Sequence, residues 1–150
     1  LAPFNAWQII QGLETVGLRM KQHCTNAEKV VTFLETQKKV TNVIYPTNHQ
    51  GEIKERALKY MKGGYGSLVG MDVGTKENGA KFIDNLKMLY HVANIGDARS
   101  LAIHPATTTH SQLNDKELLA AGVTPGYVRL SIGIEHPDDI IADIKQALAA

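Results

Sequence analysis

The chain has 150 residues, of which 43% are hydrophobic and 21% charged, and its net charge is +1. This length suits one domain with its own core, and the near-neutral charge gives no electrostatic reason to expect nucleic acid or an anionic membrane as partner. No apolar run is long enough to cross a bilayer. The single cysteine, Cys24, excludes a disulfide within the chain and is typical of the cytoplasm.

The N-terminal residues predict a long amphipathic helix that begins at Pro3. Its apolar residues recur at steps of three and four: Phe4, Trp7, Ile10, Leu13, Val16 and Met20. The pattern resumes between Ala27 and Leu34, so we expect the helix to continue, with a bend near residues 24–26. Because the chain starts without a methionine and already in this pattern, we expect it to be a piece of a longer protein.

Strands and helices alternate through the middle of the chain. The patterns predict, in chain order, a strand over 40–45, a helix over 52–60, a strand that includes 69–73, a helix ending near 86 and a strand ending at 94. A glycine turn precedes the second strand, and Thr75 is placed to cap the second helix.

The last third opens with a long segment over residues 94–113, which we expect to be mostly irregular. Asn114 and Glu117 then form the pattern of a capping box. A strand follows, with apolar residues alternating from Val128 to Ile134, and Pro137 opens a helix. The element order predicts an α/β fold, a two-layer α+β arrangement in which helices cover one face of a small sheet.

Most candidate sites have a simpler structural explanation. The glycines of "GGYGSLVG" miss the spacing of a dinucleotide-binding loop and lead into a strand, which favours a turn. The six histidines show no i, i+4 pair and Cys24 has no cysteine partner, so a zinc site is unsupported, although His104 and His110 share one loop. Hydrogen bonds to the backbone are the simpler explanation for these two histidines. The serines lack the context of a hydrolase nucleophile.

Acidic residues of the last helix are explained by the helix dipole and by surface charge. They are Asp138, Asp139 and Asp143.

Arg129 has two interpretations. It lies in the middle of the last strand, on the polar face, and is one of only four arginines in a chain with 12 lysines. The pattern alone favours a solvated surface residue, because sheets with one wet face are common. The small neighbours Ser131 and Gly133, however, leave room beside the guanidinium, whose planar fork matches a carboxylate with two parallel hydrogen bonds.

Two stretches resemble the C-terminal domain of the pyridoxal-phosphate enzymes of cysteine and methionine metabolism. They are "VANIGDARSLAIHPATTTH" and "GVTPGYVRLSIGIEHPDDIIADIKQAL". The opening "APFNAWQIIQGLETVGLRMKQHCTNAEKV" resembles the long helix by which that family enters its small domain. The resemblance covers residues 1–150 and departs from the family after Pro46, where Thr47-Asn48 replaces a Pro-Gly-Leu turn. It implies the small domain of the aminotransferase-like fold type I, with a mostly antiparallel sheet.

Within the family, Asn94-Ile95-Gly96 is similar to the O-acetylhomoserine sulfhydrylase branch, since cystathionine synthases and lyases carry Ser-Leu-Gly there. This branch replaces the acetate of O-acetylhomoserine by sulfide or a small thiol, which gives homocysteine or methionine. By position, the resemblance makes Arg129 the residue that binds the substrate carboxylate, places Asn94 in the same pocket, and puts Thr109 and His110 in the pocket loop. It implies no catalytic residue in this chain.

The resemblance also implies where the cofactor lies. Pyridoxal phosphate needs a lysine for its Schiff base, and none of the 12 lysines has the Ser-x-x-Lys setting of the family. The cofactor-binding large domain would therefore precede this chain, which alone would be inactive. We also expect an amino acid as substrate, a homo-oligomer (a tetramer in the full-length enzyme), a cytoplasmic location, and a loop over residues 94–110 that only the rest of the enzyme or substrate orders.

Two alternatives remain open. Within the family, the chain could belong to a cystathionine γ-synthase, a cystathionine γ-lyase or a methionine γ-lyase. In another class, it could be a binding or assembly module that kept the fold without the chemistry.

Overall fold

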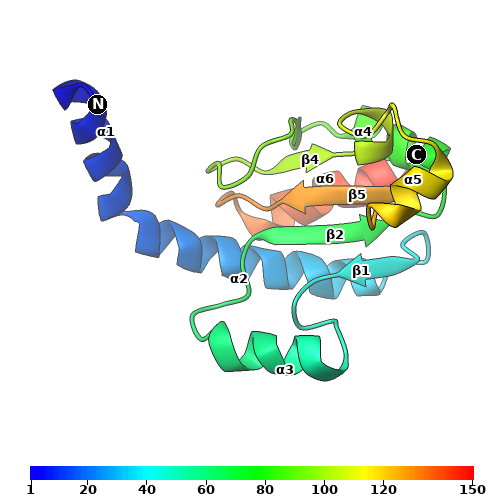
Figure 1. The fold of residues 1–150 in the computed structure, drawn as a ribbon, viewed down its shortest axis with the longest axis horizontal. Coiled ribbons are helices and arrows are strands. Elements are labelled where there is room, and N and C mark those ends of the chain that lie inside the picture. Colours follow the sequence, from blue (N-terminus) through cyan, green and yellow to red (C-terminus); the bar gives the residue numbers. More distant parts are fainter.

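The computed structural model describes residues 1–150, which form six α-helices and one five-stranded sheet (Figure 1). The helices are α1 Pro3–Glu14, α2 Val16–Glu35, α3 Gly51–Tyr60, α4 Lys76–Asn85, α5 Asp115–Ala120 and α6 Pro137–Ala149. The strands are β1 Asn42–Ile44, β2 Leu68–Asp72, β3 Tyr90–His91, β4 Leu101–Ile103 and β5 Tyr127–Ser131, and one short 3-10 helix spans Pro105–Thr107. No helix has the length and hydropathy needed to span a membrane.

The sheet has the strand order β1-β2-β5-β4-β3. Three of its four pairings are antiparallel and only β3 with β4 is parallel, which confirms the predicted mostly antiparallel sheet. Strand β5 therefore lies in the centre of the sheet, between β2 and β4, although it is the last strand in the chain. Its middle residue, Arg129, lies opposite Gly70 of β2 on one side and opposite Ile103 of β4 on the other.

Helices cover one face of the sheet, as the sequence predicts (Figure 1). The fully buried side chains of β2 and β5 on this face pack with α2, α4 and α6 into one hydrophobic core. They alternate along each strand: Val69 and Met71 on β2, Val128 and Leu130 on β5. Because successive strand residues point to opposite faces, Arg129 projects from the other face, away from these helices.

The predicted bend near residues 24–26 is wrong, because the helix breaks at Thr15 instead. Thr15 has φ −106° and ψ 4°, and α2 continues unbroken from Val16 to Glu35. Asn26 stays helical because its side chain does not compete for the local backbone. Its amide donates to the carbonyls of Gly133 and Glu135, and His23 contacts the Ile132 carbonyl at 2.6 Å.

The segment over residues 94–113 is mostly irregular, as the sequence predicts. It contains β4, whose three residues are all buried, and the 3-10 helix that follows. His104, at the junction, has no exposed surface and binds the Pro125 carbonyl through Nε2 at 2.7 Å, as the backbone-bonding interpretation predicts. Residues 100–106 are thus tied into the core, whereas residues 94–99 are exposed. That substrate or the rest of the enzyme orders the loop over residues 94–110 stays a prediction.

The predicted caps of the later helices are present. Thr75 accepts a hydrogen bond from the Asn78 amide at the start of α4. Asn114 and Glu117 form the full capping box of α5. The predicted surface role of Asp143 is wrong: it is only 6% exposed and accepts three backbone N–H groups, because it lies on the side of α6 that faces the core.

Candidate substrate-binding site

The side chain of Arg129 is half-buried, which corrects the solvated interpretation that the pattern alone favours. The polar face of β5 is not a wet surface throughout. Ser131 is 2% exposed and Gly133 is buried, because the backbone at Ala98 and Ser100 closes over the end of the strand. Only the part of this face around Arg129 stays accessible.

The guanidinium of Arg129 has few partners in its own chain. Nη2 donates to the backbone carbonyl of Asn94 at 3.3 Å, and Nε is buried without an acceptor. Arg129 is in neither of the two ion pairs of the chain, Arg56 with Glu52 and His136 with Asp138. A buried donor without an acceptor costs about 1–3 kcal/mol. Arg129 is therefore a cation held in place without an anion.

A cavity of about 510 Å³ opens beside Arg129. One wall is α3, with Ile53, Ala57 and Tyr60, and the other is the sheet surface around Leu68 and Gly70. Most of its lining is hydrophobic, and its two guanidiniums are those of Arg129 and of Arg56, which is paired with Glu52. This combination suits a small molecule that carries both a carboxylate and an apolar part.

Gly70 and Tyr127 shape the cavity next to the arginine. A Cβ on Gly70 would lie 2.7 Å from Cε2 of Tyr127 and 3.1 Å from Cβ of Ile44, so only glycine leaves room for the ring. Burial raises the pKa of the Tyr127 hydroxyl above its ordinary 10.0, although the Arg129 guanidinium acts in the opposite direction. The hydroxyl is therefore a neutral donor at physiological pH.

Sequence reasoning missed both residues, and the available signal was the strand period. Tyr127 precedes Arg129 by two residues and so shares its face. Gly70 is brought opposite Arg129 only by the pairing of β2 with β5.

The other predicted site residues lie in two places. Asn94 contacts Arg129, but through its backbone carbonyl; its side-chain Oδ1 accepts from the Ile95 amide instead. Thr109 and His110 pair with each other, with Thr109 Oγ1 2.8 Å from His110 Nδ1, and neither lines the cavity beside Arg129. The structure thus brings Asn94 and Arg129 together and leaves Thr109 and His110 apart from them.

The lysines of this chain do not fit a pyridoxal-phosphate site. Eleven of the 12 are exposed and the last, Lys54, is half-buried. A Schiff-base lysine needs a shielded position next to groups that bind the phosphate and the ring. None of the 12 lysines therefore has the surroundings that a Schiff-base lysine needs.

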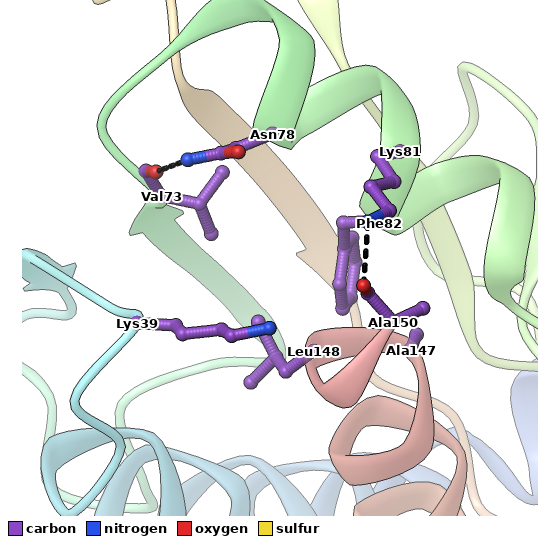
Figure 2. A pocket seen from close by; sticks show the side chains of 8 residues that line it. All are labelled: Lys39, Val73, Asn78, Lys81, Phe82, Ala147, Leu148 and Ala150. Carbon is purple, nitrogen blue, oxygen red and sulfur yellow. Dashed lines mark hydrogen bonds between the residues drawn. The ribbon is translucent and has the colours of Figure 1, made fainter.

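Figure 2 shows a second, smaller cavity of about 180 Å³ near the end of α6. Its polar groups already bind the chain itself. Lys81 Nζ donates to the Ala150 carbonyl at 2.5 Å, Lys39 Nζ to the Ala149 carbonyl at 3.4 Å, and Asn78 Nδ2 to the Val73 carbonyl at 3.0 Å. Lysines at a helix C-terminus commonly stabilise it in this way, so this cavity is explained without a ligand.

Comparison with known proteins identifies the family. The family model of the Cys/Met metabolism PLP-dependent enzymes matches residues 1–149. The chain is 51% identical to an O-acetyl-L-homoserine sulfhydrylase of Leptospira meyeri and 45% identical to O-acetyl-L-homoserine sulfhydrylase 1 of Thermus thermophilus, over 99% of its length in both cases. It covers 34% and 36% of these relatives.

A solved structure agrees with these matches. A Campylobacter jejuni protein provisionally named O-acetylhomoserine (thiol)-lyase superposes on the whole chain with a TM-score of 0.91 and 43% identity, and the match covers 36% of that protein. That protein contains N'-pyridoxyl-lysine-5'-monophosphate. The chain, which spans about a third of the length of the relatives it matches, belongs to the Cys/Met metabolism PLP-dependent enzymes.

Proposed function

We propose that residues 1–150 are the small C-terminal domain of a longer enzyme, in which Arg129 binds the α-carboxylate of an amino acid substrate. The observation that carries the proposal is a half-buried guanidinium with no carboxylate partner in its own chain. Buried arginines are normally paired, so the missing anion points to a ligand. A carboxylate would accept two parallel hydrogen bonds and so be fixed in direction as well as in position.

The proposed reaction is replacement at the γ-carbon of O-acetylhomoserine. The Cγ–O bond breaks, acetate leaves with the bonding electrons, and the sulfur of sulfide or a small thiol forms the new bond, which gives homocysteine or methionine. Support comes from the Asn94-Ile95-Gly96 sequence and from relatives named O-acetyl-L-homoserine sulfhydrylase at 45–51% identity. When bound elsewhere in the enzyme, pyridoxal phosphate supplies the electron sink for this chemistry.

The residues of this chain contribute binding and orientation. Arg129 holds the carboxylate, the Asn94 carbonyl holds one arm of the guanidinium, and the Tyr127 hydroxyl offers a neutral donor beside it. The apolar side chains of α3 line the same space. For Thr109 and His110 the proposed place in the pocket loop rests on the resemblance alone.

The cofactor-binding domain would precede this chain and pack on α1. Four apolar residues of this helix, Phe4, Trp7, Ile10 and Leu13, are each more than half exposed, and α1 extends away from the sheet (Figure 1). The relatives are about three times as long as the chain, which leaves room for such a domain. The family resemblance further supports a homotetramer in the cytoplasm as part of this proposal.

The test uses the full-length enzyme. It should turn over O-acetylhomoserine with sulfide far better than with cysteine, whereas a preference for cysteine would favour the cystathionine branch. Loss of two charged hydrogen bonds in Arg129→Ala should cost about 3–5 kcal/mol, so we expect kcat/KM to fall by a hundredfold to a few thousandfold. Arg129→Lys should recover only part of this loss, because lysine offers a point charge.

An exposed cation elsewhere in the chain provides the control. Lys145 lies on α6 and does not line the cavity beside Arg129, so Lys145→Ala should stay near the wild-type rate. Melting curves should show that all variants fold. A near-normal kcat/KM for Arg129→Ala would rule out the carboxylate role.

A further inference from the structure

The segment from Asn94 to Ser100 is held at its two ends by Arg129 of β5 and by Glu135, which follows β5. At one end the Asn94 carbonyl accepts from Arg129. At the other end Ser100 is bound by Glu135, which lies just beyond β5 and before α6. Glu135 has no lysine, arginine or histidine partner within 4.0 Å, so Ser100 is its main binding partner.

Both oxygens of the Glu135 carboxylate bind Ser100. Oε1 accepts the Ser100 backbone N–H at 2.6 Å, and Oε2 accepts the Ser100 hydroxyl at 2.9 Å. The same hydroxyl oxygen accepts the Gly133 N–H at 2.8 Å. Together with the bond from the Ile134 N–H to the Ala98 carbonyl at 2.9 Å, these contacts join the segment to the end of β5.

The backbone of Ala98 and Ser100 lies so close to residue 133 that only glycine fits there. A Cβ there would lie 2.5 Å from both the Ala98 carbonyl oxygen and the Ser100 nitrogen. From the other side, the Asn26 amide donates to the backbone carbonyls of Gly133 at 3.0 Å and Glu135 at 2.8 Å. The Glu135 backbone is thus anchored to α2, and its carboxylate cannot easily follow Ser100 if that residue moves.

We propose that Glu135 is a positioning residue for Arg129. It anchors the segment 94–100, so that the Asn94 carbonyl lies where it holds Nη2 and turns the remaining donors of the guanidinium toward the substrate carboxylate. This role rests on the proposed carboxylate binding by Arg129. A purely structural Glu135 would stabilise the fold equally well but would not affect how tightly the substrate is bound.

The test compares Glu135→Ala and Glu135→Gln in the full-length enzyme. A misplaced Arg129 weakens a hydrogen bond that is made before and during the reaction, so we expect KM for O-acetylhomoserine to rise about tenfold in Glu135→Ala, with kcat within about twofold and KM for sulfide unchanged. Glu135→Gln keeps one acceptor for the Ser100 N–H and should recover part of this change. Amide hydrogen exchange over residues 95–99 should be faster in Glu135→Ala.

Asp143 provides the matched control, because it is another carboxylate that accepts backbone amides but lies on the covered face of the sheet. Asp143→Ala should lower the melting temperature and leave KM for O-acetylhomoserine unchanged. If Glu135→Ala behaves in the same way, with unchanged KM, the positioning role is wrong. If Glu135→Ala does not fold, Glu135→Gln decides, since the proposal requires its KM to exceed that of the wild type.

The Arg129 variants separate the two proposals. A collapse of kcat/KM in Arg129→Ala, with normal KM in both Glu135 variants, would leave carboxylate binding intact and overturn only the positioning role. Normal kinetics in Arg129→Ala would overturn both.

Discussion

The buried carboxylate of Asp143 binds the backbone of the turn at residues 87–89. Its two oxygens accept the backbone N–H groups of Lys87, Met88 and Leu89, each at 2.9 Å, and Gln146 donates to it at 3.0 Å. Burial alone would raise the pKa of Asp143, but the hydrogen bonds from these amides together outweigh burial and hold the pKa below the ordinary 3.8. The carboxylate therefore fixes the turn that leads into β3.

This depressed pKa makes a pH-dependent contribution to stability. A group with a lowered folded pKa stabilises the protein fully above its unfolded pKa, and the contribution disappears as the pH falls through the folded pKa. We expect Asp143→Asn to lower the free energy of unfolding by about 1–3 kcal/mol near neutral pH, because an amide replaces an ionised acceptor. The difference from the wild type should shrink as the pH falls below 3.8.

Urea unfolding of the two chains over a pH series measures this difference. If the difference in unfolding free energy between wild type and Asp143→Asn stays the same at pH values well below 3.8, the charge of Asp143 does not stabilise the turn.

On the scale of elements, His104 links β4 to the segment before β5. Its Nδ1 lies 2.9 Å from Thr107 Oγ1, and its Nε2 binds the Pro125 carbonyl. Burial lowers the pKa of His104, with smaller contributions from Lys76 and His91, against the opposing effect of the Pro125 carbonyl. The neutral ring then donates from Nε2 and accepts at Nδ1, so both contacts are satisfied.

Helix α4 can pack on this ring only because Gly79 has no side chain. A Cβ there would lie 2.6 Å from Cδ2 of His104. We expect Gly79→Ala to destabilise the chain by about 1–3 kcal/mol despite the higher helix propensity of alanine, because the ring must move from its hydrogen bonds. Urea unfolding followed by circular dichroism measures the change.

Gly12 is the matched control, since it is also helical but a Cβ added there would have no neighbouring atom within 4 Å. There the alanine should increase helix content and stability slightly, by up to about 1 kcal/mol. Equal effects at the two positions would contradict a packing role for Gly79.

On the scale of the whole molecule, the apolar side chains of α1 stay exposed outside the two layers. The sheet packs against α2, α4 and α6, whereas α1 buries none of its residues. Rows of exposed aromatic and aliphatic side chains usually mark an interface. The proposed cofactor-binding domain accounts for this row on α1.

Trp7, the only tryptophan of the chain, reports on this surface and is 55% exposed. We expect its fluorescence in the 150-residue chain to be red-shifted and readily quenched by iodide. In the full-length enzyme the difference spectrum between wild type and Trp7→Phe should be blue-shifted and protected, because a packed domain excludes water and quencher. Equal quenching in both proteins would show that α1 is not an interface.

Local patterns determined most of the elements. The 3.6-residue period, the capping box at Asn114 and Glu117, and Pro137 at the start of α6 act within a few residues, so helices could be placed from sequence. The alternation in β5 also assigned Arg129 correctly to the face opposite the core residues Val128 and Leu130. Family resemblance then pointed to its partner segment at Asn94.

Tertiary contacts decided the rest, because they join residues far apart in the chain. Only the pairing of β5 with β2 and β4 sets Gly70 opposite Arg129, and β4 is too short and too closely flanked by polar residues to be recognised alone. Likewise, the burial of Asp143 depends on which side of α6 meets the turn at residues 87–89. In the sequence, both Arg129 and Asp143 fit the pattern of surface charges. In the fold, Asp143 accepts hydrogen bonds from amides of its own chain, whereas Arg129 has no carboxylate partner in the chain.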